Sequence, residues 1–301
     1  MGGRFDHVHC VWLGMLANRA AQGLWETTPA RCGNGLDLAV GRSAALWRCP
    51  PLLRHHPEPA MILWTSPQGD SHNMCGRFVQ YSDAELYAEI FELGRVCAAS
   101  ARYNAAPSQD ILAVRQAFDG VRELIPLRWG LVPAWSKGPD TRYSMINTRA
   151  ETVADKPAYR HAFRQRRCLI PSEGFYEWRV TPTGKQPCLI RRADAAPFAM
   201  AGLWETWQTG GTPLQTCTII VTDANALIAP VHDRMPVIIQ PNDYGAWLDP
   251  HHGDQADLTA LLRPADPTGW VLYPVSPRVN NARNEGPDLI QPDPQPDGQR
   301  A

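Results

Sequence analysis

The feature that most constrains the fold is a succession of short apolar runs separated by gaps of hairpin length. The runs cover residues 110–114, 121–127, 168–170, 174–180, 187–191, 198–204, 216–222, 236–240 and 270–275. Asp119-Gly120 supplies a turn between the first two runs. Strands that outnumber helices and follow one another closely favour antiparallel pairing over a doubly wound parallel sheet. We therefore predict an α+β fold: a single domain with a mostly antiparallel, barrel-like β core and flanking helices.

The first helix is predicted just after Met74, where regular patterning begins. Residues 82–85 (SDAE) form a capping box. In the helix that follows, Leu86, Ile90 and Leu93 fall on one face, which Tyr87 and Phe91 widen. Further helical stretches are predicted at 150–166, 242–248 and 254–263, and a Trp/Pro/Gly-rich loop at 129–139.

Both ends of the chain differ from this patterned region. Residues 1–73 contain scattered Pro, Gly, Trp and Arg and show no sustained period of 3.6 or 2, so they offer little from which to build a packed element. From Gln291 the chain is rich in Pro, Asp and Gln, and we predict a disordered tail over 293–301. The predicted domains are thus an extension at 1–73, a folded domain at 74–292 and this tail.

Composition narrows the class of protein. The 301 residues are 44% hydrophobic and 20% charged, which suits a globular protein, and the formal net charge of −1 means that nucleic acid must be bound by a local patch. No apolar run has the length of a membrane span, and the apolar stretch 8–16 makes a poor signal peptide. The eight cysteines include no C-x-x-C pair, so we expect reduced cysteines, a cytoplasmic location, and neither structural zinc nor another metal or cofactor.

Four segments carry residue types suited to chemistry. They are MCGRF (74–78), INTRAE (146–151), GFYEW (174–178) and VHDRMP (231–236). With RYNAAPSQ (102–109), WGLVPAW (129–135), AGLWE (201–205) and NARNEGPDLIQP (281–292), they give the chain a pattern that resembles the SOS-response-associated peptidase family, whose members are abasic-site processing proteins. Several short, unusual motifs in one order are far more specific than any one of them. The resemblance implies binding of single-stranded DNA that contains abasic sites.

In that family the methionine of Met-Cys starts the protein and is removed, which leaves cysteine as the N-terminus. Here the matching pair is Met74-Cys75, after 73 residues. Either Met74 is the true initiator, which the lack of pattern upstream favours, or the upstream segment is cut off. An α-amine of pKa about 7.7–8.0 and a thiol of about 8.5 could then condense with the aldehyde of an opened abasic sugar to give a thiazolidine. A cysteine alone is more often an inert buried thiol.

Three further residues are predicted catalytic partners of Cys75. Strand alternation places Phe175 and Glu177 on one face, so burial should raise the pKa of the Glu177 carboxyl group. By resemblance Glu177 is the acid/base for ring opening and imine formation, His232 transfers protons, and Asn147 positions the cysteine and the sugar. On pattern alone, a surface strand glutamate and a hydrogen-bonded core or loop histidine are the better interpretations of Glu177 and His232, and Asn147 could be a turn or capping asparagine.

The DNA contacts are predicted from arginines beside these residues. Arg77, Arg149 and Arg234 each lie within two residues of a catalytic candidate, as a phosphate track requires. Trp135 could stack on a base, whereas Trp129 is predicted to be a core residue. The run Arg164, Arg166 and Arg167 is interpreted as a solvated helix face.

The predicted function is therefore covalent capture and shielding of abasic sites by a monomer through Cys75, without a membrane partner and with nucleoid association when bound to DNA. Two alternatives stay open. A thiol peptidase or autopeptidase would use Cys75 and His232 but would not need a terminal amine. A non-covalent single-stranded DNA-binding module would need the arginines and Trp135 but not Cys75.

Overall fold

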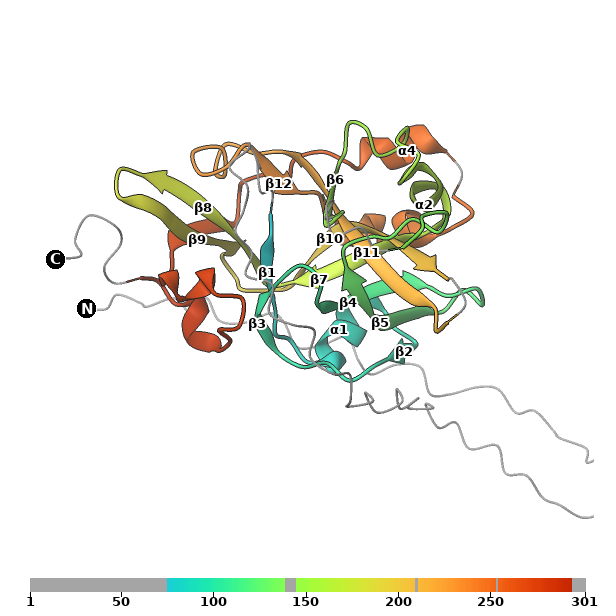
Figure 1. Ribbon diagram of the computed structural model, residues 1–301, viewed down its shortest axis with the longest axis horizontal. Coiled ribbons are helices and arrows are strands. Elements are labelled where there is room, and N and C mark those ends of the chain that lie inside the picture. The colour runs from blue at the N-terminus through green and yellow to red at the C-terminus, as the bar shows by residue number, and fades with distance from the viewer. Residues whose placement is uncertain (1–74, 139–144, 209–210, 253, 294–301) are drawn as a thin grey trace, which may run out of the picture. The chain divides into compact units, whose positions relative to one another are not determined.

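The computed structural model describes residues 75–138, 145–208, 211–252 and 254–293 (Figure 1). The predicted extension 1–73 and nearly all of the predicted tail lie outside these residues. The described chain is a mostly antiparallel α+β structure, as predicted, and its strands fall into two sheets.

A closed barrel of five strands forms the larger of the two sheets in the described part of the chain. Antiparallel pairs join them in the order β5-β4-β7-β10-β11, and a parallel pairing of β11 with β5 closes the ring. Three of the five strand pairings, β4 with β7, β7 with β10 and β11 with β5, therefore join segments far apart in the sequence. The five strands are β4 (Asp110–Gln116), β5 (Arg122–Trp129), β7 (Arg167–Ser172), β10 (Phe198–Trp207) and β11 (Leu214–Asp223).

Four short strands extend the barrel sheet. β6 runs parallel to β11, β12 pairs with the same strand in antiparallel fashion, β13 pairs with β10, and β2 lies beside β5. These strands are β2 (Arg95–Val96), β6 (Asn147–Arg149), β12 (Arg234–Pro236) and β13 (Ile238–Ile239). As a result, residues near 147 and residues near 234 both lie alongside β11.

The second sheet has the strand order β14-β9-β8-β1-β3. Its strands are β1 (Arg77–Gln80), β3 (Arg102–Ala105), β8 (Gly174–Thr181), β9 (Gly184–Arg192) and β14 (Trp270–Pro274). The β8–β9 hairpin projects away from the barrel strands (Figure 1). β8 alternates as predicted, because Phe175 packs into the core cluster that contains Cys75 while Tyr176 packs into another.

The helices are shorter than predicted. The stretch 150–166 forms turns up to residue 159, followed by a single short helix, because Pro157 interrupts it. The helical segments are α1 (Ala84–Phe91), α2 (Arg160–Gln165), α3 (Tyr244–Leu248) and α4 (Gln255–Ala260), with 3-10 turns η1 (Pro241–Asp243), η2 (Pro277–Asn280) and η3 (Pro287–Ile290).

Two details of the predicted first helix are wrong. The N-cap is Asp83, whose carboxylate accepts a hydrogen bond from Leu86 N at 2.8 Å. The backbone N–H of Ser82 instead points to the carboxylate of Glu173. The buried face also differs, since Tyr87 and Phe91 are fully buried whereas Leu86 is exposed. Two large aromatic rings remove more apolar surface from water than the leucine face would.

Arg167 is another correction, because it does not belong to a solvated helix face. It begins β7 and is 2% exposed, and its guanidinium group donates hydrogen bonds to the carbonyl oxygens of Trp247, Phe163, Arg164 and Asp249. Burial lowers the pKa of this group to about 10. The arginine therefore ties the carbonyl ends of α2 and α3 to the barrel.

Candidate active site

Cys75 lies against the side chain of Glu177. β1 and β8 pair in antiparallel register, with Arg77 opposite Tyr176, so the residue two positions before Arg77 reaches Glu177 on the next strand. The backbone N of Cys75 donates a hydrogen bond of 2.8 Å to Glu177 Oε1. The nitrogen that would be the α-amine of an N-terminal cysteine is thus the atom that touches the carboxyl group.

Glu177 is a buried acid with a strongly perturbed pKa. Its side chain shares the apolar face of Phe175 and is only 1% exposed. Burial raises the pKa of its carboxyl group to about 8, although hydrogen bonds from Cys75 act in the opposite direction. This is the direction predicted from the strand alternation, and it lets the group hold or release a proton near neutral pH.

The Cys75 thiol is buried as well, and its backbone is strained. Burial and the negative charge of Glu177 raise the pKa of the thiol well above its usual value, so the thiol keeps its proton. The φ angle of Cys75 is 25°, in the left-handed region that a non-glycine residue rarely adopts. That angle exists only when a residue precedes Cys75, because φ is a rotation about the bond between N and Cα relative to the previous carbonyl carbon.

Asn147 also contacts Cys75 directly. It begins β6, and the parallel pairing of Asn147 with Ile219 on β11 fixes its position. Its amide Nδ2 donates to the carbonyl oxygen of Cys75 at 3.3 Å. The structure therefore holds both backbone polar groups of Cys75 by side chains that lie 72 and 102 residues away in the sequence.

His232 precedes β12 in the same region. Its Nδ1 accepts a hydrogen bond from the backbone N of Arg234 at 3.0 Å. The adjacent Asp233 Oδ1 lies 3.1 Å from Nδ1. The negative charge of Asp233 also raises the pKa values of Cys75 and Glu177, after the larger effect of burial, so this loop faces the site.

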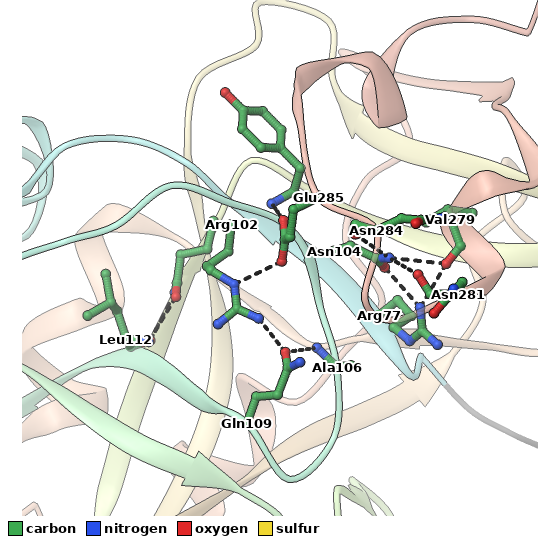
Figure 2. A network of polar contacts seen from close by, with 12 residues as sticks. Arg77, Arg102, Asn104, Ala106, Gln109, Leu112, Val279, Asn281, Asn284 and Glu285 are labelled. Atoms are coloured by element: carbon green, nitrogen blue, oxygen red, sulfur yellow. Dashed lines mark hydrogen bonds and ion pairs between the residues drawn. The ribbon is translucent and has the colours of Figure 1, made fainter. Parts of the chain in front are cut away.

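Arg77 is engaged in a polar network (Figure 2). Its Nη1 donates to Asn104 Oδ1 at 2.9 Å and to the carbonyl oxygen of Val279 at 2.8 Å, and its Nη2 donates to the carbonyl oxygen of Asn280. The buried Asn104 side chain in turn donates to three carbonyl oxygens of the segment 279–284. These contacts fasten that segment to β1 and β3, and the role of Arg77 as a phosphate contact stays a prediction.

Arg149 and Arg234 differ in how readily their guanidinium groups could contact a DNA phosphate. Arg149 is exposed at the end of β6. Arg234 is largely covered, at 17% side-chain exposure, and its Nη1 pairs with Glu151 Oε1 and with Asp223 Oδ1. Both DNA-binding roles remain predictions, but a phosphate would meet Arg234 already paired.

The two tryptophans behave differently. Trp129 is a fully buried core residue, as predicted, with its Nε1 donating to the carbonyl oxygen of Ile146 at 2.9 Å. Trp135 is 72% exposed, so a large apolar ring faces solvent. Such a ring is free to stack on a base, and its predicted role stays a prediction.

Sequence reasoning missed three residues around the site. Asn104, Glu151 and Asp233 lie inside the family motifs, but no role was predicted for any of them. A buried asparagine in RYNAAPSQ gives no periodic signal, because its value lies in satisfying carbonyl groups of a segment about 175 residues away. The two carboxylates could have been suspected from their position beside Arg234 and Arg149.

A cavity of about 670 Å³ lies apart from the predicted site residues. Its lining includes Phe198, Tyr244, Arg263 and Trp270, and it contains no residue predicted to act in catalysis. In the part of the chain that the structure describes, no cluster of three potential metal ligands occurs, and no helix is long and apolar enough to cross a membrane.

The fold and the site together define the class of protein. A small antiparallel barrel and a second sheet hold the nitrogen of a buried cysteine against a buried carboxyl group of raised pKa, beside an asparagine and a histidine loop. The sequence profile of the SOS response associated peptidase (SRAP) family matches residues 74–282. The chain belongs to this family.

Individual relatives agree with this assignment. The abasic site processing protein YoqW of Bacillus subtilis is 42% identical over 224 residues, which cover 72% of this chain and 99% of the relative. The abasic site processing protein YedK of Escherichia coli is 30% identical, with 73% and 100% of the two chains covered. A solved structure of a protein from Bacteroides thetaiotaomicron superposes with a TM-score of 0.59 at 26% identity, covering 71% of this chain and 91% of the other.

Proposed function

We propose that this protein processes abasic sites in single-stranded DNA by forming a covalent thiazolidine through Cys75. The relatives named as abasic site processing proteins support the substrate class. The observation that carries the chemistry is the 2.8 Å contact between the Cys75 nitrogen and the Glu177 carboxyl group. It joins the atom that would attack the sugar to a buried carboxyl group that can exchange a proton with it.

The reaction balances without an oxidant or reductant. The abasic deoxyribose opens from its cyclic hemiacetal to an aldehyde as the ring oxygen gains the proton that the C1′ hydroxyl loses. The Cys75 amine adds to C1′, and one water leaves as the imine forms. The Cys75 sulfur then adds to C1′ while its proton passes to nitrogen. The product holds new C–N and C–S bonds in one five-membered ring.

The side chains around Cys75 divide the proton transfers. Protonated Glu177 donates to the departing hydroxyl, and its carboxylate then accepts the thiol proton, since it also hydrogen-bonds the thiol. Asn147 fixes the Cys75 carbonyl and so orients both nucleophilic atoms. His232, in the loop before β12, would transfer a proton during ring opening.

The proposal requires that Cys75 become the first residue. An amide nitrogen is delocalised into the preceding carbonyl and cannot form an imine. Initiation at Met74 followed by methionine removal, or cleavage before Cys75, would each supply the amine.

The test compares the 301-residue chain with the chain that starts at Cys75, each verified by intact mass. Both are mixed with single-stranded DNA that carries one abasic site, and adducts are read on a denaturing gel. We expect a heat-stable adduct from the shorter form only, and none with intact DNA. An uncleaved long chain that reacts as fast and as stably would show that the amine is not the nucleophile.

A matched pair of variants separates amine from thiol. Cys75→Ser keeps the terminal amine, so borohydride should trap an imine although no heat-stable adduct forms without reduction. Cys75→Ala should behave in the same way. If cleavage of peptides by the Cys75 form proceeded without abasic DNA, the thiol peptidase would replace this proposal. If undamaged and abasic DNA bound equally in all variants without an adduct, the protein would be a non-covalent binding module.

A further inference from the structure

Three adjacent strands place opposite charges together beside the candidate site. Arg149 on β6 lies opposite Val221 of β11, and Arg234 on β12 lies opposite Asp223 of the same strand. Glu151 follows two residues after β6 ends. The register of β11 with its two neighbours therefore brings both arginines and both carboxylates to one end of this strand.

Both carboxylates form ion pairs with Arg234 in this structure. Its Nη1 contacts Glu151 Oε1 and lies 3.0 Å from Asp223 Oδ1, while its side chain is 17% exposed. Glu151 is the better placed of the two acids, since its side chain is 45% exposed against 75% for Asp223. Burial raises the pKa of Glu151, but its hydrogen bonds and the charges of Arg234 and Arg149 bring it below the usual value, so Glu151 is ionised at neutral pH.

We infer that Glu151 is a specificity-determining residue that occupies Arg234 in place of a DNA phosphate. The inference rests on the proposed function, because it assigns Arg234 to the DNA track. A phosphate that reaches Arg234 must displace a carboxylate which already makes the same kind of charged contact. Intact single strands are thereby bound weakly, whereas an abasic strand is retained by the covalent bond to Cys75.

The local charges also weaken non-covalent binding of DNA. Around this end of β11 the two arginines face three carboxylates, those of Glu151, Asp223 and Asp233. The chain as a whole has a formal net charge of −1. A protein selected only for affinity to phosphates would leave its arginines unpaired, since each free phosphate contact strengthens binding.

The experiment measures binding of a fluorescent, undamaged oligothymidylate by anisotropy at several salt concentrations. Undamaged DNA offers no aldehyde for covalent capture, and Cys75→Ala also removes the thiol. The measurement uses both the 301-residue chain and the form that starts at residue 75. Glu151→Gln in this background should tighten binding about 2- to 5-fold, the range expected for a partly exposed ion pair. The slope of log K against log salt should steepen by up to about 0.7, one added single-strand phosphate contact.

The matched control is Glu92→Gln, which removes the same charge from the C-cap residue of α1, a glutamate that pairs with Arg122 at 2.9 Å. It should change affinity less than 2-fold, because a general charge effect without a local phosphate contact is screened. In an Arg234→Ala background, Glu151→Gln should have no effect. This double-mutant comparison assigns the gain to the pair itself.

Three results would overturn the inference. Weaker binding by Glu151→Gln would show that the carboxylate orients Arg234 toward DNA. An equal gain in the Arg234→Ala background would show that the arginine is not involved. Absence of binding in every form would remove the DNA track altogether. The adduct assay with Cys75 intact tests the proposed function separately. If no adducts form but Glu151→Gln still tightens binding of undamaged DNA, only the covalent proposal is refuted.

Discussion

The buried carboxyl group of Glu177 makes the stability of the protein depend on pH in a window that can be stated in advance. In the 301-residue chain its pKa rises from 4.5 to about 8. Between these values the folded state holds a proton that the unfolded state has lost. The stabilisation from this group is therefore complete below about pH 4.5 and is lost as the pH rises through about 8.

The magnitude follows from the size of the pKa difference. A rise of about 3.5 units, at about 1.36 kcal/mol per unit, corresponds to an effect on the order of 5 kcal/mol on the free energy of unfolding. Glu177→Gln keeps the shape of the side chain and an acceptor oxygen for the Cys75 N–H, but it carries no charge. The variant should match the wild-type chain near pH 5 and exceed it progressively up to pH 9.

The assay is chemical denaturation followed by tryptophan fluorescence at pH 5, 6, 7, 8 and 9. The difference between Glu177→Gln and the wild-type chain cancels every other titrating group. Glu89→Gln, which changes an exposed glutamate of α1, should show no such trend. A difference that stays constant from pH 5 to 9 would refute the conclusion that Glu177 is desolvated.

The same comparison distinguishes the two forms of the chain. When Cys75 is the first residue, its ammonium group lies where the amide N–H now contacts Glu177 Oε1 at 2.8 Å. A positive charge at that distance favours the carboxylate and lowers its pKa. The gain from Glu177→Gln at high pH should therefore shrink or change sign in the form that begins at Cys75.

Four other substitutions have outcomes that the structure predicts. Arg149→Ala should flatten the salt dependence of single-strand binding by about 0.7 in the log–log slope without lowering the melting temperature. Arg77→Ala should flatten this slope too, and it should also destabilise the fold by about 2–3 kcal/mol, because the Arg77 side chain holds the segment 279–284. Equal losses of melting temperature in the two variants would contradict this difference between the two arginines. Gly202→Ala should cost about 1–3 kcal/mol in denaturant unfolding, since its Cβ would lie 2.9 Å from Cys168 Sγ and 3.2 Å from a backbone oxygen, and an unchanged midpoint would show that β7 and β11 can move apart. Arg167→Ala should destabilise by about 3–5 kcal/mol because buried carbonyl groups lose their donor, and thermal melting tests this directly.

Much of the site could be predicted from local sequence. Strand alternation in GFYEW places Glu177 on the apolar side with Phe175, which is enough to predict a raised pKa. The strand runs from 110 to 275 lie close to the observed strands, because β-branched residues and turn signals act over a few residues. The same local signals could not choose between Ser82 and Asp83 as a cap, since both side chains can accept the hydrogen bond.

Local sequence predicts the longer strands, the apolar side of β8 and the family motifs, but it does not predict the short strands β1, β2, β3, β6 and β12. The tertiary structure alone decided which elements meet. In the tertiary structure, Glu177 accepts a hydrogen bond from the Cys75 nitrogen 102 residues away, a parallel pairing of β11 with β5 closes the barrel, and Arg234 pairs with Glu151. The physical reason is that each of these contacts depends on the summed free energy of non-local pairing, and no window of neighbouring residues contains that sum.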